Sequence, residues 1–134
     1  MKVIKYGGHV LEDEAVNLSI VEVIAERHKS GEKIVLVHGG GPAINGELEI
    51  HQIPSEMVGG YRKTSDEAMR VVQQVLSGEI LRNLTHLFLK LGVRAVGISA
   101  SDGATIVAKQ FMPVIDGLPI DIGRVGEPDQ VDCS

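Results

Sequence analysis

The sequence predicts an α/β fold, specifically a three-layer sandwich with a mainly parallel central sheet. Short apolar segments rich in branched residues alternate with longer segments of helical spacing, which is the order of strand–helix–strand units. Aromatic residues make up 3% of the chain and Trp is absent, so Val, Ile and Leu must fill the core, as in buried parallel strands. The length of 134 residues, with 43% hydrophobic and 23% charged residues, fits one domain.

The first strand and helix are predicted at the start of the chain. Residues 3–6 form a short strand-like segment that stops at Gly7. Acidic residues 12–14 then favour a helix start, because negative charge suits the positive end of the helix dipole. Apolar residues at helical spacing follow up to Gly31, which predicts the end of this helix.

A second strand–helix unit follows. Residues 34–37 are a continuous apolar run, typical of a fully buried strand, and lead directly into a glycine turn at residues 38–41. Pro42 suits the first turn of the next helix, where its missing N–H would have no partner. This helix is expected to end near residues 52–54, and residues 55–63 are expected to form an extended excursion or a hairpin.

Two further helices are predicted in the middle of the chain. Thr64 and Glu67 stand at the spacing of a capping box, which opens a helix. Apolar residues at helical spacing continue beyond this start. Gly78 is expected to interrupt the helical pattern, and Gly92 is expected to end it.

The last third of the chain has a weaker pattern. Residues 95–98 are predicted as another buried strand, with residues 105–108 as its neighbour, joined through a turn at residues 102–103. From residue 110 onward, three prolines and several Gly and Asp residues indicate loops, with one short strand near residues 120–122.

Composition excludes several classes of function. The net charge of −5 argues against nonspecific nucleic-acid binding, which needs a basic face. No apolar run approaches the roughly 18 residues of a membrane span, and the start of the chain does not resemble a secretory signal. A single cysteine, Cys133, excludes an internal disulfide and offers no metal cluster. We therefore expect a cytoplasmic protein without a membrane partner.

Two glycine turns, Gly7–Gly8 and Gly39–Gly41, are the strongest candidates for a binding site. Each follows a predicted strand and precedes a helix, at the sheet edge where open α/β folds bind ligands. Their backbone N–H groups are suited to an anion, and Lys5 would add a mobile positive charge beside a phosphate. The spacing matches neither a Walker loop nor the dinucleotide pattern. From the residues alone, the glycines equally fit sharp turns, and Lys5 equally fits an exposed strand end.

Arg62 is a second candidate, since it follows a glycine pair and precedes a helix start. Arginine binds carboxylates through two parallel hydrogen bonds. An unpaired surface arginine is the alternative for this residue. His38 has no second His or Cys at metal-ligand spacing, so a packed, hydrogen-bonded histidine is expected there and no metal site is predicted.

Taken together, these residues resemble the acetylglutamate kinases, within the amino acid kinase family. The resemblance preserves the order and spacing of short motifs along essentially the whole chain: Lys5-Tyr6-Gly7-Gly8, Val37-His38-Gly39-Gly40-Gly41-Pro42, Gly59-Gly60-Tyr61-Arg62-Lys63-Thr64, Val75-Leu76-Ser77-Gly78, Ala95-Val96-Gly97-Ile98-Ser99, Asp102-Gly103 and Val125-Gly126-Glu127. One departure is Ser99-Ala100-Ser101-Asp102-Gly103, where the family often has Ser-Gly-Lys-Asp-Gly.

The resemblance implies transfer of the ATP γ-phosphate to the side-chain carboxylate of N-acetyl-L-glutamate, a step of arginine biosynthesis. Lys5 would be the catalytic residue that stabilises charge on the transferred group. The phosphate would be bound by Gly7, Gly8 and Gly40. The acyl amino acid would be bound by Gly40, Gly41 and Arg62, with Arg62 on its α-carboxylate.

The resemblance also implies that residues 1–134 are an amino-terminal acyl-amino-acid-binding domain. Relatives are roughly twice as long, which is the length of two domains. Their carboxyl-terminal half carries the nucleotide pocket, so ATP, with Mg, would bind through a domain absent from this chain. A homodimer is expected, with the apolar stripe around residues 68–80 partly at its interface.

Two other functions fit the same sequence. One alternative is a non-catalytic module that binds acyl amino acids or dimerises. A related acetylaminoadipate kinase is a further alternative. The segment around Arg62 argues against carbamate kinase, since that small substrate has no α-carboxylate to hold.

Overall fold

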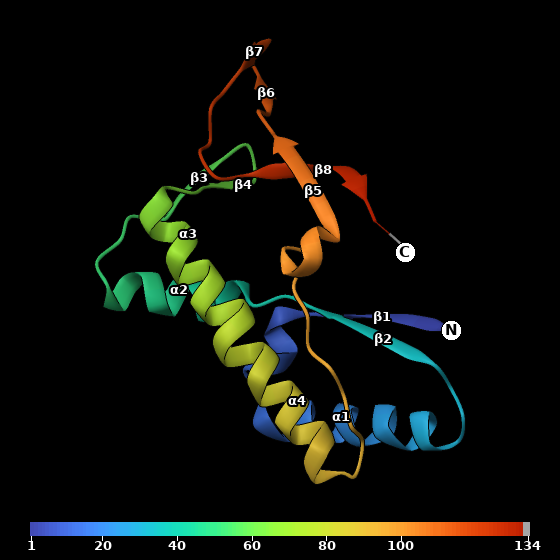
Figure 1. Cartoon of the computed structure of the whole chain (residues 1–134). Coiled ribbons are helices and arrows are strands. Elements are labelled where there is room, and N and C mark those ends of the chain that lie inside the picture. The colour runs from blue at the N-terminus through green and yellow to red at the C-terminus, as the bar shows by residue number, and fades with distance from the viewer. Residues whose placement is uncertain (133–134) are drawn as a thin grey trace.

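The computed structural model describes residues 1–132, so the prediction that Cys133 forms no disulfide lies outside the described residues. Helices and strands alternate in the first half of the chain, and short antiparallel strands dominate the last part (Figure 1). The elements are β1 (Lys2–Tyr6), a 3-10 turn (Gly8–Leu11), α1 (Glu14–Lys29), β2 (Ile34–His38), α2 (Gly41–Ile50), β3 (Glu56–Val58), β4 (Tyr61–Lys63), α3 (Asp66–Gln73), a π-helical segment (Gln74–Ile80), α4 (Leu81–Lys90), a second 3-10 turn (Asp102–Ala104), β5 (Ile106–Gln110), β6 (Val114–Ile115), β7 (Leu118–Pro119) and β8 (Gly126–Val131).

Strands β1 and β2 run parallel and in register, from Lys2 opposite Ile34 to Tyr6 opposite His38. Helices α1 and α4 lie on one side of this strand pair (Figure 1). The apolar side chains of that side pack against one core cluster, which includes Val21, Ile24, Leu48, Leu84 and Phe88. The predicted α/β class is confirmed.

The opposite face of the strand pair is open. Ile34 and Leu36 pack against the core, whereas Val35 and Val37 alternate with them and are 43% and 50% exposed. The prediction of a fully buried strand at residues 34–37 is therefore wrong. Side chains of a strand point alternately to its two faces, and a layer covers only one face here.

Local capping explains where the first two helices lie. The Asp13 carboxylate accepts hydrogen bonds from the N–H groups of Ala15 and Val16, which starts α1. Gly31, with a φ of +101°, allows the chain to turn after α1. Pro42 stands in the first turn of α2, as predicted.

Residues 66–90 form one continuous helical run of α3, the π-helical segment and α4 (Figure 1). Ser65, not Thr64, caps it, because the Ser65 hydroxyl accepts from the Ala68 N–H, whereas Thr64 donates to the Arg62 carbonyl. The prediction that Gly78 interrupts the helix is wrong, because Gly78 lies within the π-helical segment of this continuous run.

The last third of the described chain differs most from prediction. Residues 95–98 form no strand, and Val96 and Ile98 are 88% and 64% exposed. Gly97 lies against α4 instead: a methyl group placed on it would be 2.7 Å from the Leu81 Cγ. Strand β5 therefore pairs with β8, antiparallel, and not with residues 95–98. Among residues 1–132, parallel pairing of named strands is confined to β1 and β2.

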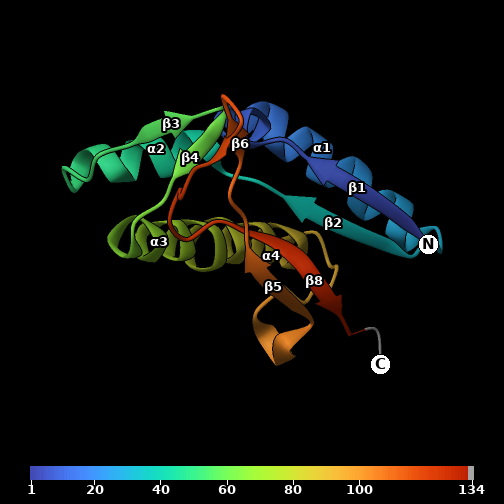
Figure 2. The same ribbon diagram turned by 90° about the horizontal axis from the view of Figure 1, so that it is seen from above.

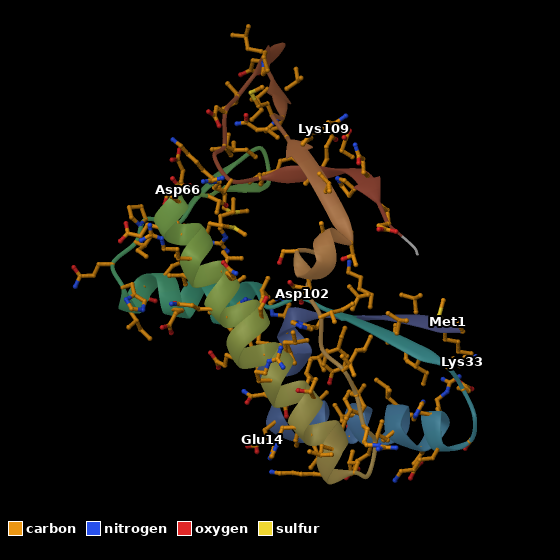
Figure 3. The ribbon with its side chains drawn as sticks, in the orientation of Figure 1. Met1, Glu14, Lys33, Asp66, Asp102 and Lys109 are labelled. Atoms are coloured by element: carbon orange, nitrogen blue, oxygen red, sulfur yellow. The ribbon has the colours of Figure 1, made fainter. Side chains whose placement is uncertain are left out.

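Residues 120–122 are also not a strand, since β7 ends at Pro119 and pairs with β6. Ile122 is nevertheless fully buried, and its carbonyl accepts from the Thr64 N–H at 2.8 Å. Arg124 donates to the Asp66 carboxylate. Asp66 is labelled at the start of α3 in Figure 3. These contacts attach the last third of the chain to the helical run.

Candidate functional site

The two glycine turns come together because β1 and β2 end side by side. The Gly39 N–H donates to the Tyr6 carbonyl at 3.2 Å, which ties the second turn to the first strand. A methyl group placed on Gly8 would lie 3.2 Å from the Gly41 nitrogen and 3.3 Å from the Gly40 nitrogen. The two turns therefore lie side by side, as predicted, and Gly8 packs closely against the start of α2.

Close approach of neighbouring atoms is the reason for glycine in these turns. None of the glycines at positions 7, 8 and 39–41 has a φ in the left-handed region, and the φ of Gly40, 178°, is that of extended backbone. A methyl group on the buried Gly40 would lie 2.4 Å from the Ile80 Cδ1 and 2.9 Å from the Leu76 Cδ2. Gly7 and Gly41, in contrast, have no neighbouring atom within 4 Å of such a methyl group. A side chain at position 8 would therefore crowd the backbone at the start of α2, and one at position 40 would displace the side chains of Ile80 and Leu76.

Apart from that of Gly39, the backbone N–H groups of the turn glycines are not used in hydrogen bonds among the described residues. Within residues 1–132, none of the backbone hydrogen bonds uses the N–H groups of Gly7, Gly8, Gly40 or Gly41 as donors. Gly41 is the first residue of α2, where unpaired N–H groups and the helix dipole favour negative charge. The arrangement can bind an anion such as a phosphate or a carboxylate.

Tyr6 fixes the end of β1 against α1. Its buried hydroxyl donates to the Asn17 Oδ1 at 2.6 Å. Burial raises the pKa of the Tyr6 hydroxyl, because the charged phenolate is poorly solvated there. Behind the turns lies a cavity of about 260 Å³ that Gly8, Gly40, Asn17 and Glu79 help to line. The first turn therefore rests on a neutral, hydrogen-bonded tyrosine.

Lys5 is exposed and stands on the open face of the strand pair, opposite Val37. Within residues 1–132 its ammonium group makes no ion pair or hydrogen bond. This position is compatible with both sequence interpretations, a charge near the turns and an exposed strand end. The His38 Nδ1 lies 3.1 Å from the Gly39 carbonyl oxygen, which agrees with the expected hydrogen-bonded histidine.

Arg62 lies beside α2, where its side chain contacts Asn45. The β3–β4 hairpin that carries Arg62 lies over this helix in the view of Figure 2. Its guanidinium donates to the Asn45 Oδ1 at 2.5 Å and to the Ser55 hydroxyl. Both acceptors are neutral, and within residues 1–132 no carboxylate pairs with Arg62. A pocket lies beside it, lined by Asn45, Glu49, Ile53, Ser55, Met57 and Arg62.

Asn45 is a residue of this pocket that the sequence analysis does not identify. The available signal is its position, four residues after Gly41, which places both residues on one face of α2. No group of three or more His, Cys, Asp or Glu side chains in residues 1–132 is arranged to hold a metal.

The chain belongs to the amino acid kinase family, whose model matches residues 1–132. It is similar to curated acetylglutamate kinases, with 43% identity to that of Streptomyces avermitilis over 97% of this chain and 46% identity to that of Bifidobacterium adolescentis over 98%. The chain spans 43% and 42% of the lengths of these two relatives.

Solved structures support the fold. The protein smu.665 of Streptococcus mutans has a TM-score of 0.74 and 27% identity, over 97% of this chain and 50% of that one. An N-acetylglutamate synthase from Neisseria gonorrhoeae, solved with coenzyme A and N-acetyl-glutamate, has a TM-score of 0.67 over 97% of this chain and 28% of that one. At 19% identity, this similarity supports the fold and nothing about function.

Proposed function

We propose that this chain supplies the acceptor side of an acetylglutamate kinase, which transfers the γ-phosphate of ATP to the side-chain carboxylate of N-acetyl-L-glutamate. Its similarity to curated acetylglutamate kinases supports the choice of reaction and substrate. Residues 1–134 would form the amino-terminal acyl-amino-acid-binding domain, and ATP with Mg would bind mainly through a further domain of the kind that the longer relatives have room for. We place the protein in the cytoplasm.

One observation carries this proposal: Arg62 contacts α2 at Asn45, four residues after the helix begins at Gly41. The N–H groups at Gly40 and Gly41 mark the start of the helix, and Asn45 holds Arg62 beside it. Four residues of an α-helix span about 6 Å along its axis. The two carboxylates of a glutamate skeleton are separated by three carbons, a span of the same order. A dicarboxylic acyl amino acid therefore fits the arrangement better than a monocarboxylate.

The proposed roles follow from charge. The α-carboxylate binds Arg62, and the side-chain carboxylate lies at Gly40 and Gly41 with an oxygen toward the γ-phosphorus. That oxygen forms the new P–O bond while the bond to the bridging oxygen of ADP breaks, so ADP leaves with the electron pair and an acyl phosphate forms. Gly7, Gly8 and Gly40 donate N–H groups to the transferred phosphoryl group, and Lys5 offsets its charge.

A homodimer is part of the proposal. Only part of the apolar stripe at residues 68–80 is available for the dimer interface. Ala68, Val71, Val75 and Ile80 are buried in the core of their own chain. Any dimer contact of this helix would use its other face, where Met69 is 39% exposed. In the helices of residues 1–132, none is long and apolar enough to cross a bilayer.

Calorimetric titration tests the acceptor site. N-acetyl-L-glutamate should bind, and Arg62→Ala should weaken its affinity about tenfold or more, because a charge-assisted pair is lost. Lys63→Ala is a matched control, since Lys63 is next in the chain but pairs with Glu56 at 3.2 Å. The proposal fails if the wild-type chain does not bind N-acetyl-L-glutamate or if Arg62→Ala binds it equally well. Tighter binding of N-acetyl-2-aminoadipate would favour the acetylaminoadipate alternative.

A further inference from the structure

Arg62 is held in place by neutral hydrogen-bond acceptors from two elements, and one of them, Asn45, has no role in the sequence-based account. We propose that Asn45 is a positioning residue for acceptor specificity, which aims the Arg62 guanidinium at the α-carboxylate of the substrate. This inference rests on the proposed function and deepens it. It assigns the selection of an α-carboxylate to a pair of residues and not to Arg62 alone.

The hydrogen bonds of Arg62 fix the orientation of its planar group. One terminal nitrogen donates to the Asn45 Oδ1 at 2.5 Å, and the other donates to the Ser55 hydroxyl. A guanidinium has five N–H donors, so further donors stay available for the two parallel hydrogen bonds that a carboxylate accepts. With both nitrogens held, the arginine loses little further side-chain entropy when a ligand binds.

The neutrality of Asn45 is as important as its position. A carboxylate at position 45 would pair with Arg62 and cancel the charge that the substrate needs. Glu49 lines the same pocket one helical turn further on, and it forms no ion pair with Arg62. An amide therefore orients the guanidinium while it leaves the positive charge to the ligand.

The platform that carries Asn45 is rigid. Ile44 and Leu48, on either side of Asn45 in sequence, are buried in the core. The start of α2 is fixed as well, because Gly40 lies directly beneath Ile80 and Leu76. Asn45 itself is exposed, so a substitution there should leave the fold intact. A loss of binding in an Asn45 variant would then report on Arg62 and not on folding.

The test compares N-acetyl-L-glutamate with 4-acetamidobutanoate, which is the same molecule without the α-carboxylate. Affinities are measured by calorimetry for the full chain and for Asn45→Ala, Asn45→Asp, Arg62→Ala and the double variant Asn45→Ala/Arg62→Ala. Glu47→Gln is the matched control, because Glu47 lies on α2 and contacts His51 at 3.1 Å, away from Arg62. Thermal melting of each variant checks its fold.

We expect Asn45→Ala to weaken N-acetyl-L-glutamate binding about tenfold, the size of one charge-assisted hydrogen bond, and to leave 4-acetamidobutanoate unchanged. Asn45→Asp should weaken it at least as much, through charge cancellation. The double variant should bind like Arg62→Ala alone, because Asn45 acts through Arg62.

Unchanged affinity for N-acetyl-L-glutamate in Asn45→Ala would overturn the inference. The inference would also be overturned if Asn45→Ala weakened binding by the same factor in the Arg62→Ala background as in the wild-type chain. In either case selective binding by the wild-type chain would leave the proposed function standing. If the wild-type chain binds the two compounds equally, or neither, the proposed function fails and the role of Asn45 falls with it.

Discussion

Residues 1–93 and residues 94–132 are built in different ways. The core cluster is formed entirely by residues between Tyr6 and Val93. Within residues 94–132, only Pro113 and Ile122 are buried. The first region is held by packing, whereas the second is held by strand pairing and a few hydrogen bonds. Every residue of the candidate site lies in the first region, where packing against the core fixes the backbone.

The largest expected difference between the two regions is in stability. Leu48 is 1% exposed, so Leu48→Ala should lower the free energy of unfolding by about 2–5 kcal/mol through lost burial and a cavity. Leu118 is 65% exposed, and Leu118→Ala should change the free energy of unfolding by less than about 0.5 kcal/mol. Urea denaturation measures both. Equal effects would mean that the second region is packed as firmly as the first.

A smaller effect is expected at the glycine turns. Gly40→Ala places a methyl group against Ile80 and Leu76, and the strain should cost about 1–3 kcal/mol. Gly41→Ala is the matched control, because open space surrounds that position and α2 begins there. Thermal melting should give a lower melting temperature for Gly40→Ala than for Gly41→Ala. The reverse order would contradict the steric reason given for Gly40.

The smallest effect concerns the ion pair between Asp66 and Arg124, which connects the two regions. The hydrogen bond from Arg124, together with its charge, lowers the pKa of the Asp66 carboxyl. A lowered folded pKa means that the contribution to stability is present above the unfolded pKa, about 4, and is lost as the pH falls through the folded value. The pair is exposed, so the contribution is small. A carboxyl NMR titration should give a higher Asp66 pKa in Arg124→Gln. An unchanged pKa would mean that this ion pair does not connect the two regions.

Sequence patterns predict the fold correctly where a local signal suffices. The glycine turns, the hairpin before Thr64 and the end of α1 at Gly31 follow from turn chemistry within a few residues. Residues 95–98 have the composition of a buried strand, but burial depends on a covering layer that periodicity does not report. Gly97 packs against α4, and the segment pairs with no strand.

The candidate site shows the same limit. Lys5, Arg62 and the glycines stand out by residue type and spacing. Asn45 is an ordinary helical residue until the hairpin folds back over α2 and brings Arg62 to it. Seventeen positions separate the two in sequence, so the contact belongs to the tertiary fold. The motif likewise predicts Thr64 as the helix cap, and this prediction is wrong, because the backbone sets which hydroxyl faces the helix and here it is that of Ser65.

The central claim is that the two glycine turns and Arg62 form one acceptor site, and amide NMR shifts test it most directly. On titration with N-acetyl-L-glutamate, the amide signals of Gly7, Gly8, Gly40 and Gly41 and the side-chain Nε–H signal of Arg62 should shift together with a single dissociation constant. Shifts confined to other parts of the chain, or separate constants for the turns and for Arg62, would contradict it.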